Sequence, residues 1–206
     1  NLYNTGGRYN PSSDSWTATS TVNAPAAREY HTAVFGGGEM IIWGGYSDGS
    51  NTPTGGRYNP SSDSWLATTL TGAPAPRRFH KAIWAQNGMI IWGDAGNSGG
   101  IYFPTQDAWV ATSTTNAPEA RNFHSQKWTG SQMIIWSGSN LSTGGLLTPP
   151  GPPSNLTLGG NLSGLAGDQV VLQNNGGNDL VLNGNGDFTF AGNVDDNSSY
   201  DVTVLT

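Results

Sequence analysis

The sequence has no cysteine among its 206 residues, and only 11% of its side chains are charged. Without cysteine, neither a disulfide framework nor a thiolate metal site can form within the chain, and its compartment stays open. Long apolar runs are missing as well, since no stretch of 18 apolar residues occurs, and no long amphipathic helical pattern is visible. These absences argue against membrane insertion and against an α-helical fold.

Charge is distributed unevenly along the chain. Residues 151–206 contain six aspartates and no lysine or arginine, so the net charge of −6 arises entirely there. An acidic surface with no compensating basic stripe repels nucleic acids and anionic membranes, and we therefore expect neither as a partner. The sequence begins at Asn1 without a methionine or a signal peptide, so we expect either a removed leader or a fragment of a longer chain.

Turn-forming residues are abundant. Glycine and proline account for 42 of the 206 residues (30 plus 12), and Ser, Thr and Asn fill many of the remaining positions. This composition is typical of short strands that alternate with turns, and it predicts an all-β protein.

A repeated segment organises the first two thirds of the chain. The sequence GGRYNPSSDSW of Gly6–Trp16 returns unchanged at Gly55–Trp65, and a looser copy occupies Gly99–Trp109. Each copy is followed by Arg-x-x-His and then by Met-Ile-Ile-Trp, whose last residue recurs at spacings of 49 and 44 (positions 43, 92 and 136). A period of this size indicates a propeller or solenoid, because a four-stranded unit needs about 40 to 50 residues. We expect structural roles for the repeat anchors, with the tryptophans in the core: Arg28, His31, Trp43, Arg77, His80, Trp92, Arg121, His124, Trp136, Trp16, Trp65 and Trp109.

The pattern resembles the Kelch repeat. In that repeat an Arg and a His precede the innermost strand, a hydrophobic strand ends in paired glycines (here Gly44 and Gly45), and a Tyr-containing strand leads to the Trp of Asp-Ser-Trp. The resemblance covers about residues 6–138 and departs from the family where Gly93-Asp94 and Ser137-Gly138 replace the paired glycines. It implies four-stranded blades arranged radially in a β-propeller over residues 1–138.

The copies fill an incomplete set of blades. Residues 6–21 supply a third and an outer strand, the copies from Arg28 and Arg77 are complete, and the copy from Arg121 supplies an inner and a second strand before a weak GGLLTP segment. Pairing the two ends would give three blades, fewer than the usual four or more. Three accounts stay open: a fragment of a longer propeller, two chains that exchange half-blades in a six-bladed ring, and a closed three-bladed monomer. Exposed edge strands also permit end-to-end association into filaments.

The composition changes after residue 136. Residues 139–154 are rich in Pro and Gly and are expected to form an extended linker. Alternating apolar segments then predict strands at 155–158, 169–173, 179–182, 188–190 and 200–205, packed as an antiparallel β-sandwich. The segment GLAGDQVVLQNNGGNDLVLNGNGDFTF resembles Ig-like repeats of bacterial secreted and surface proteins. We therefore expect an all-β chain: Kelch-type β-propeller blades and a C-terminal Ig-like module over 155–206 that is cut short.

No residue cluster defines a reaction, and we expect no catalytic, cofactor or metal site. Three histidines on inner strands would suit a metal in a central channel, but their recurrence at one place in every copy favours packing and hydrogen bonding. A sialidase-like arginine triad would need a Tyr–Glu pair, and the three glutamates, Glu29, Glu39 and Glu119, lie in or beside repeat strands. Asp14 and Asp63 are expected to be turn residues that bond nearby backbone amides.

Two polar turns in the tail, residues 183–187 and 193–197, offer oxygen ligands that suit Ca²⁺. Neither matches a defined calcium loop. Ordinary hairpin turns are the preferred interpretation, with calcium binding as the alternative.

The sequence favours a non-enzymatic protein of the extracellular space or the bacterial cell surface. It would bind a protein or glycan ligand, or act as a structural scaffold through self-association. The alternative is a carbohydrate-active propeller enzyme whose catalytic blades are absent from this chain. Loops on a rigid scaffold often carry function, and those between the second and third strands vary between copies. The candidate binding residues in these loops are Tyr46, Ser47, Asp48, Asn51, Asp94, Asn97 and Asn140.

Overall fold

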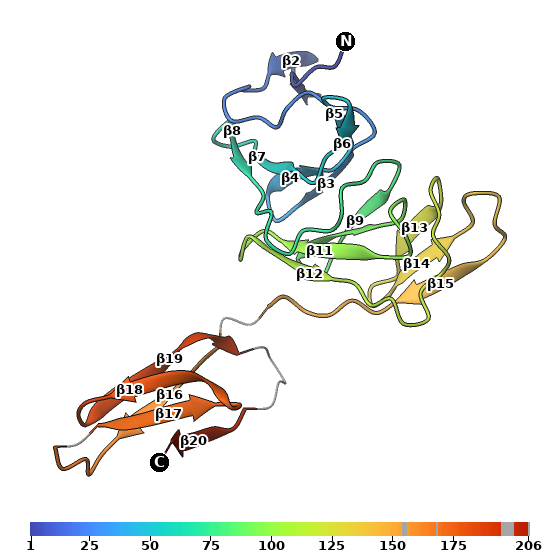
Figure 1. Ribbon diagram of the computed structural model, residues 1–206. Coiled ribbons are helices and arrows are strands. Elements are labelled where there is room, and N and C mark those ends of the chain that lie inside the picture. The colour runs from blue at the N-terminus through green and yellow to red at the C-terminus, as the bar shows by residue number, and fades with distance from the viewer. Residues whose placement is uncertain (154–155, 168, 195–199, 206) are drawn as a thin grey trace. The chain divides into compact units, whose positions relative to one another are not determined.

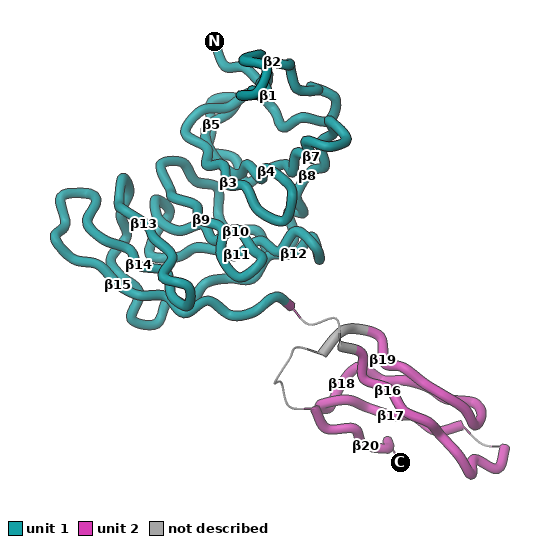
Figure 2. Tube along the Cα trace, turned by 180° about the vertical axis from the view of Figure 1, so that it is seen from behind, with its two compact units in different colours: residues 1–152 teal, residues 153–206 magenta. Residues whose placement is uncertain are grey.

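The computed structural model describes residues 1–206 except 154–155, 168, 195–199 and 206. Its described residues form 20 strands and no helix, which confirms the all-β prediction (Figure 1). Accordingly, this part of the chain holds no helix with the length and apolarity to span a membrane. The chain divides into two compact units, Asn1–Pro152 and Pro153–Thr206 (Figure 2).

Two four-stranded antiparallel sheets form the centre of the first unit, and in each the strands pair in chain order. The β3–β8 sheet contains β3 (Thr32–Gly36), β4 (Glu39–Trp43), β7 (Gly55–Asn59) and β8 (Ser64–Ala67). A small hairpin of β5 (Tyr46–Ser47) and β6 (Ser50–Asn51) interrupts the connection from β4 to β7. The β9–β12 sheet contains β9 (Lys81–Ala85), β10 (Gly88–Trp92), β11 (Gly99–Phe103) and β12 (Ala108–Ala111).

Shorter sheets flank these two. The β1–β2 sheet, of β1 (Gly7–Asn10) and β2 (Ser15–Ala18), corresponds by sequence to β7 and β8. The β13–β15 sheet, of β13 (Ser125–Trp128), β14 (Met133–Trp136) and β15 (Gly144–Leu147), corresponds to β9, β10 and β11. The four sheets succeed one another in chain order (Figure 1).

Strand β15 lies inside the range 139–154 that we expected to be a linker, so the prediction is wrong for these four residues. The glycine pair Gly144-Gly145 explains the strand. A Cβ atom on Gly144 would lie 2.2 Å from the carbonyl oxygen of Ile135, and one on Gly145 would lie 2.5 Å from Cγ of Pro118. Only glycine can therefore bring the backbone this close to β14 and to the preceding loop.

The core consists of the contacts between neighbouring sheets. Side chains alternate between the two faces of a strand, so each Met-Ile-Ile-Trp segment presents Met and the second Ile to one side and the first Ile and Trp to the other. Ile41 and Trp43 of β4 pack with Met89 and Ile91 of β10 in one buried cluster. The same pairing recurs one sheet further on, where the opposite face of β10 packs with Met133 and Ile135 of β14.

Not every repeat tryptophan lies in this core. Trp43, Trp65, Trp92 and Trp109 are buried as expected, whereas Trp16 and Trp136 are 72% and 55% exposed. The prediction is wrong for these two residues because each belongs to one of the short flanking sheets. There the sheet that would cover the tryptophan is missing from the described residues.

Strand β3 begins at Thr32, two residues after Tyr30, because Tyr30 has a left-handed backbone with φ of 57°.

The prediction for Asp63 is wrong. Its Oδ1 accepts hydrogen bonds from the Tyr58 hydroxyl (2.6 Å) and from the backbone amide of Ser20 (3.0 Å), which belongs to the preceding repeat. Asp63 therefore joins two sheets instead of bonding nearby amides.

The second unit contains two antiparallel sheets. One pairs β16 (Leu156–Leu162) with β19 (Gly186–Val194), and the other has the order β18 (Gly177–Leu182), β17 (Val170–Asn174), β20 (Val202–Leu205). Each of the five strands expected here overlaps one of these. Leu172 and Phe190 are its buried apolar side chains among the described residues.

Candidate binding site

The three arginines of the Arg-x-x-His motifs hold loops in place. Arg77 is buried, and it donates hydrogen bonds to the carbonyl oxygens of Ala75 (3.0 Å), Gly93 (3.0 Å) and Ser98 (2.7 Å). Arg28 and Arg121 make the corresponding bonds in their own copies, with Thr54 and Thr143 in the place of Ser98. Each guanidinium thus ties the loop after the second strand to the segment before the first.

The histidines contribute to packing between sheets. His80 and His124 are buried, and their rings lie edge-on to Trp43 and Trp92 of the preceding sheet, with centroid separations of 5.5 and 5.3 Å. Burial, together with the charge of nearby Arg77, lowers the pKa of His80 to about 3, so its ring is neutral near pH 7. The first histidine of the series, His31, is exposed. In the part of the chain that the structure describes, no three His, Asp or Glu side chains come together as a metal site.

The residue directly before His in each Arg-x-x-His motif is aromatic, and these three residues form a continuous surface feature. The ring of Phe79 lies 4.6 Å from that of Tyr30 and 5.0 Å from that of Phe123, measured between centroids. Tyr30 and Phe123 are exposed, and Phe79 is half-buried between them. We call Tyr30, Phe79 and Phe123 the aromatic row.

The backbone of the aromatic row is strained. Tyr30, Phe79 and Phe123 have φ angles of 57°, 57° and 56°, in the left-handed region that bulky side chains rarely adopt. Such a conformation costs of order 1–3 kcal/mol per residue and persists where the surrounding structure enforces it, often at a functional site. The same costly conformation thus recurs at three aromatic residues, each just before the first strand of its sheet.

The variable loops support the row. The backbone of Glu29 pairs with that of Tyr46, the amide of Arg78 donates to Oδ2 of Asp94 (3.0 Å), and the amide of Asn122 donates to Oγ of Ser139 (3.0 Å). The guanidinium carbon of Arg78 lies 4.9 Å from the ring centroid of Tyr46 and 5.1 Å from that of Phe79. A cation therefore lies beside the rings, where both Tyr46 and Phe79 attract it.

The candidate loop residues fall into three groups. Tyr46 and Asp94 contact the segments that carry the row, through Glu29 and Arg78. Ser47 is buried and its hydroxyl donates to the carbonyl oxygen of Ala27, so this residue is wrongly placed among surface contacts. The others lie away from these contacts: Asp48, Asn97 and Asn140 are exposed, and Asn51 pairs with Tyr46 across the β5–β6 hairpin.

Sequence reasoning missed the aromatic row itself, together with Arg78. The signal was available, because an aromatic residue separates Arg from His in every copy while the other intervening residue changes from Glu to Arg to Asn. A repeated residue that the core does not use is a candidate for function. What the sequence does not give is the left-handed backbone that turns each ring outward.

The polar turn at 183–187 is engaged by the chain itself. Asn185 exchanges two side-chain hydrogen bonds with the backbone of Leu165, at 2.7 and 3.1 Å, and Oδ1 of Asp187 accepts a hydrogen bond from Asn161 (2.8 Å). Oδ1 of Asn185 and Oδ1 of Asp187 thus accept hydrogen bonds within the chain. The second candidate turn, 193–197, falls largely outside the described residues.

Comparison with known proteins gives no family for this chain. No family model matches it, and no curated protein matches its sequence at a significant level. The internal repeat and the geometry of the aromatic row are therefore the features of this chain that bear on its function.

Proposed function

We propose that this chain is a non-enzymatic binding protein that engages a ligand across the aromatic row. The single observation behind this proposal is the contiguous set of three rings on strained backbone, with Tyr30 and Phe123 exposed and Phe79 half-buried between them. A rigid array of this kind gives a large contact area at a low cost in conformational entropy, since the rings are already fixed before the ligand arrives.

The proposed scaffold is a set of Kelch-type propeller blades followed by an Ig-like module. Two features support it: strands that pair in chain order within each four-stranded sheet, and one set of contacts that recurs from sheet to sheet. A propeller places the segments before its inner strands on one face, and the row occupies those segments. We assign the protein to the extracellular space or the bacterial cell surface, with adhesion or scaffolding as its role.

A protein is the ligand class that the row fits best. Tyr, Phe and Arg are enriched in protein–protein interfaces, and energetic hot spots in such interfaces combine aromatic rings with Arg. Asp94 accepts a hydrogen bond from the backbone amide of Arg78, and the guanidinium of Arg78 lies over the rings of Tyr46 and Phe79. A partner segment with apolar side chains and a carboxylate would match this surface.

The test is binding by the chain to peptide and glycan arrays, with the double variant Phe79→Asn, Phe123→Asn as comparison. Asparagine tolerates the left-handed backbone, so the substitutions remove the rings without adding strain. We expect the parent chain to bind a subset of peptides and the variant to lose at least tenfold in affinity, the order expected from removing interface hot spots.

Leu70→Asn serves as the matched control because Leu70 is exposed but lies outside the row. It should bind as the parent does. Equal binding by the parent and the double variant would refute the role of the row, and binding to glycans alone would show that the ligand class is wrong.

A further inference from the structure

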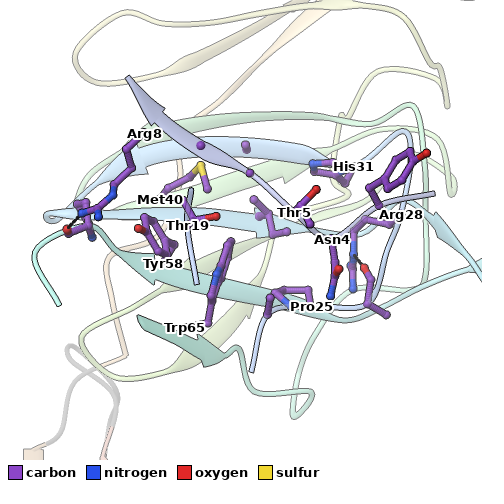
Figure 3. Close-up of a pocket in the computed structure, with 18 of the residues that line it drawn as sticks. Asn4, Thr5, Arg8, Thr19, Pro25, Arg28, His31, Met40, Tyr58 and Trp65 are labelled. Carbon is purple, nitrogen blue, oxygen red and sulfur yellow. Dashed lines mark hydrogen bonds between the residues drawn. The ribbon is translucent and has the colours of Figure 1, made fainter. Parts of the chain in front are cut away.

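A cavity of about 450 Å³ lies where the β1–β2 sheet meets the β3–β8 sheet (Figure 3). The β3–β8 sheet lines it with side chains that include Phe35, Met40 and Ile42, and the N-terminal segment lines the other side. The outer half of this face is covered. Arg8 donates to the carbonyl oxygen of Pro60 (2.6 Å), and the indole N–H of Trp65 donates to that of Ser20 (3.0 Å).

The neighbouring sheet shows what fills the equivalent space. On the β9–β12 sheet, the outer half is covered by the same two bonds, from Arg57 to Pro104 (2.7 Å) and from Trp109 to Thr69 (3.1 Å). Its inner half, which includes Met89, is covered by Ile41 and Trp43 of β4. Met40 is the residue that corresponds to Met89 in the repeat. The cavity at Met40 should therefore accept a strand that presents an Ile and a Trp side chain, as β4 does.

Strand β14 presents that pair. Ile134 and Trp136 occupy the positions of Ile41 and Trp43, yet they are 38% and 55% exposed instead of buried. Phe35, Tyr9 and Trp16 are exposed as well, although their equivalents Trp84, Tyr102 and Trp109 pack in the cluster between complete sheets. The β1–β2 sheet and the β13–β15 sheet thus each present an uncovered apolar face, and together they correspond to one four-stranded sheet divided between the two ends of the first unit. This sheet would also cover the open face of the β3–β8 sheet.

The edges of the two half-sheets are complementary too. Among the described residues β1 pairs with β2 alone, so its other edge is free. The repeat fixes the register: Trp43 lies opposite Gly55 and Ile41 opposite Arg57, which places Trp136 opposite Gly6 and Ile134 opposite Arg8. That edge of β14 is occupied by β15, whose Gly144 and Leu146 hold the same two positions.

We propose that β14 of one protein molecule pairs with β1 of a second molecule of the same chain and releases β15. Strands β13 and β14 of the first molecule and β1 and β2 of the second then form one four-stranded sheet across the interface. This inference rests on the repeated-sheet architecture of the proposed function. The exchange replaces one set of backbone hydrogen bonds by another. Its driving force is the burial of Phe35, Ile134 and Trp136, together with Tyr9 and Trp16.

Each molecule carries both halves of the contact, β1–β2 at one end of the first unit and β13–β14 at the other, so association is head-to-tail. Such a contact closes into a ring or continues as an open series, depending on the rotation between copies. Both products contain the same pairing of β14 with β1.

The test is the solution mass of the full chain by light scattering over a wide concentration range. We expect the mass to rise from that of one chain to that of two or more. Trp136→Glu should raise the dissociation constant at least tenfold, because it places a charge in the buried contact. Gly145→Val should lower the dissociation constant, because a larger side chain collides with Pro118 and frees the edge of β14.

Leu66→Glu is the control, an equally polar change at an exposed residue outside the contact, and it should associate as the parent does. Register is tested by mixing an Ile134→Cys chain with an Arg8→Cys chain in a protein that has no other cysteine. Oxidation should link the two chains, whereas Tyr9→Cys, on the opposite face of β1, should not link.

A mass of one chain at every concentration, for both the parent and Gly145→Val, would overturn the inference. The inference would also be overturned if Ile134→Cys formed a disulfide equally well with Arg8→Cys and with Tyr9→Cys. Neither result affects the aromatic row, whose residues lie outside both half-sheets. Array binding by a monomeric chain would therefore refute the association and leave the proposed function intact.

Discussion

Two contacts between neighbouring sheets can be compared: the contact between the two four-stranded sheets, and the contact between the β1–β2 sheet and the β3–β8 sheet. Equivalent side chains of the repeat lie in both, but their surroundings differ. Met89 and Ile91 are fully buried because β4 lies across them, whereas their equivalents Met40 and Ile42 line a cavity. The sequence motif is the same in both places. Burial in this protein is therefore decided by whether a neighbouring sheet is present, and the motif specifies only what that neighbour must look like.

The residue that follows each Met-Ile-Ile-Trp strand illustrates the same rule. A Cβ on Gly93 would lie 2.6 Å from the ring of His124 in the following sheet, so glycine is required there. The equivalent residue after β14 is Ser137, at φ of 61°. Among the described residues of the first unit, the β13–β15 sheet is the last sheet, so a side chain has room at this position.

The largest effect is expected from truncating equivalent tryptophans. Trp92→Ala should lower the free energy of unfolding by about 3–5 kcal/mol, because Trp92 is 2% exposed and its removal leaves a cavity between two sheets. Trp136→Ala, at the equivalent but exposed position, should cost less than about 1 kcal/mol. Chemical denaturation followed by far-UV circular dichroism measures both values.

These measurements belong at low protein concentration, where the chain is a single copy. A large cost for Trp136→Ala under those conditions would mean that the indole is covered within one chain. The comparison between filled and open contacts would then fail at β14.

The sequence was sufficient for the strands and for the contacts that repeat. Alternation within Met-Ile-Ile-Trp, the spacing of 49 and 44 residues and the Gly/Pro content together predict an all-β chain with equivalent sheets. The glycine pair Gly144-Gly145 also predicts β15, since the same pair opens β7 and β11, but the proline-rich segment after it obscured this signal.

The candidate site was less accessible from the sequence. Tyr30, Phe79 and Phe123 are 44 to 49 residues apart in sequence (79 minus 30, and 123 minus 79), and only the packing of three sheets brings their rings within about 5 Å. Their outward direction depends on a backbone conformation that aromatic residues seldom adopt. The loops that support them were found because they vary, and the residues they support were missed because they repeat.

A smaller effect is expected at the glycines that open the third strands. A Cβ on Gly100 would lie 2.4 Å from Cγ of Pro74, so Gly100→Ala should lower the free energy of unfolding by about 1–3 kcal/mol through overpacking. At the equivalent Gly7, the nearest atom to a Cβ is in the ring of exposed Trp16, at 3.0 Å. Gly7→Ala should change stability by less than about 0.5 kcal/mol.

Thermal and chemical unfolding of the two glycine variants gives the comparison directly. Equal costs at Gly100 and Gly7 would show that β1 already has a close neighbour on this side. That result would also count against the open inner half of the β1–β2 contact.

The smallest effect concerns the histidines and pH. His80 has a pKa of about 3 in the folded chain, lowered by burial and by nearby Arg77, against about 6.5 when unfolded. Between these values the unfolded chain binds the extra proton, so the free energy of unfolding falls as the pH falls below about 6.5. The expected contribution is about 1 kcal/mol lost between pH 7 and pH 5.5, at about 1.4 kcal/mol per pH unit below the unfolded pKa.

Denaturation at pH 7 and pH 5.5 tests this by comparing His80→Gln with the parent. The variant should lose less stability on acidification than the parent does, because its side chain takes up no proton. His31→Gln, at the equivalent exposed position, should alter the pH dependence less, since an imidazole in contact with water is protonated at smaller cost. If His31→Gln alters the slope as much as His80→Gln, the first histidine is buried in solution. Some other segment must then cover the face that lies open in this structure.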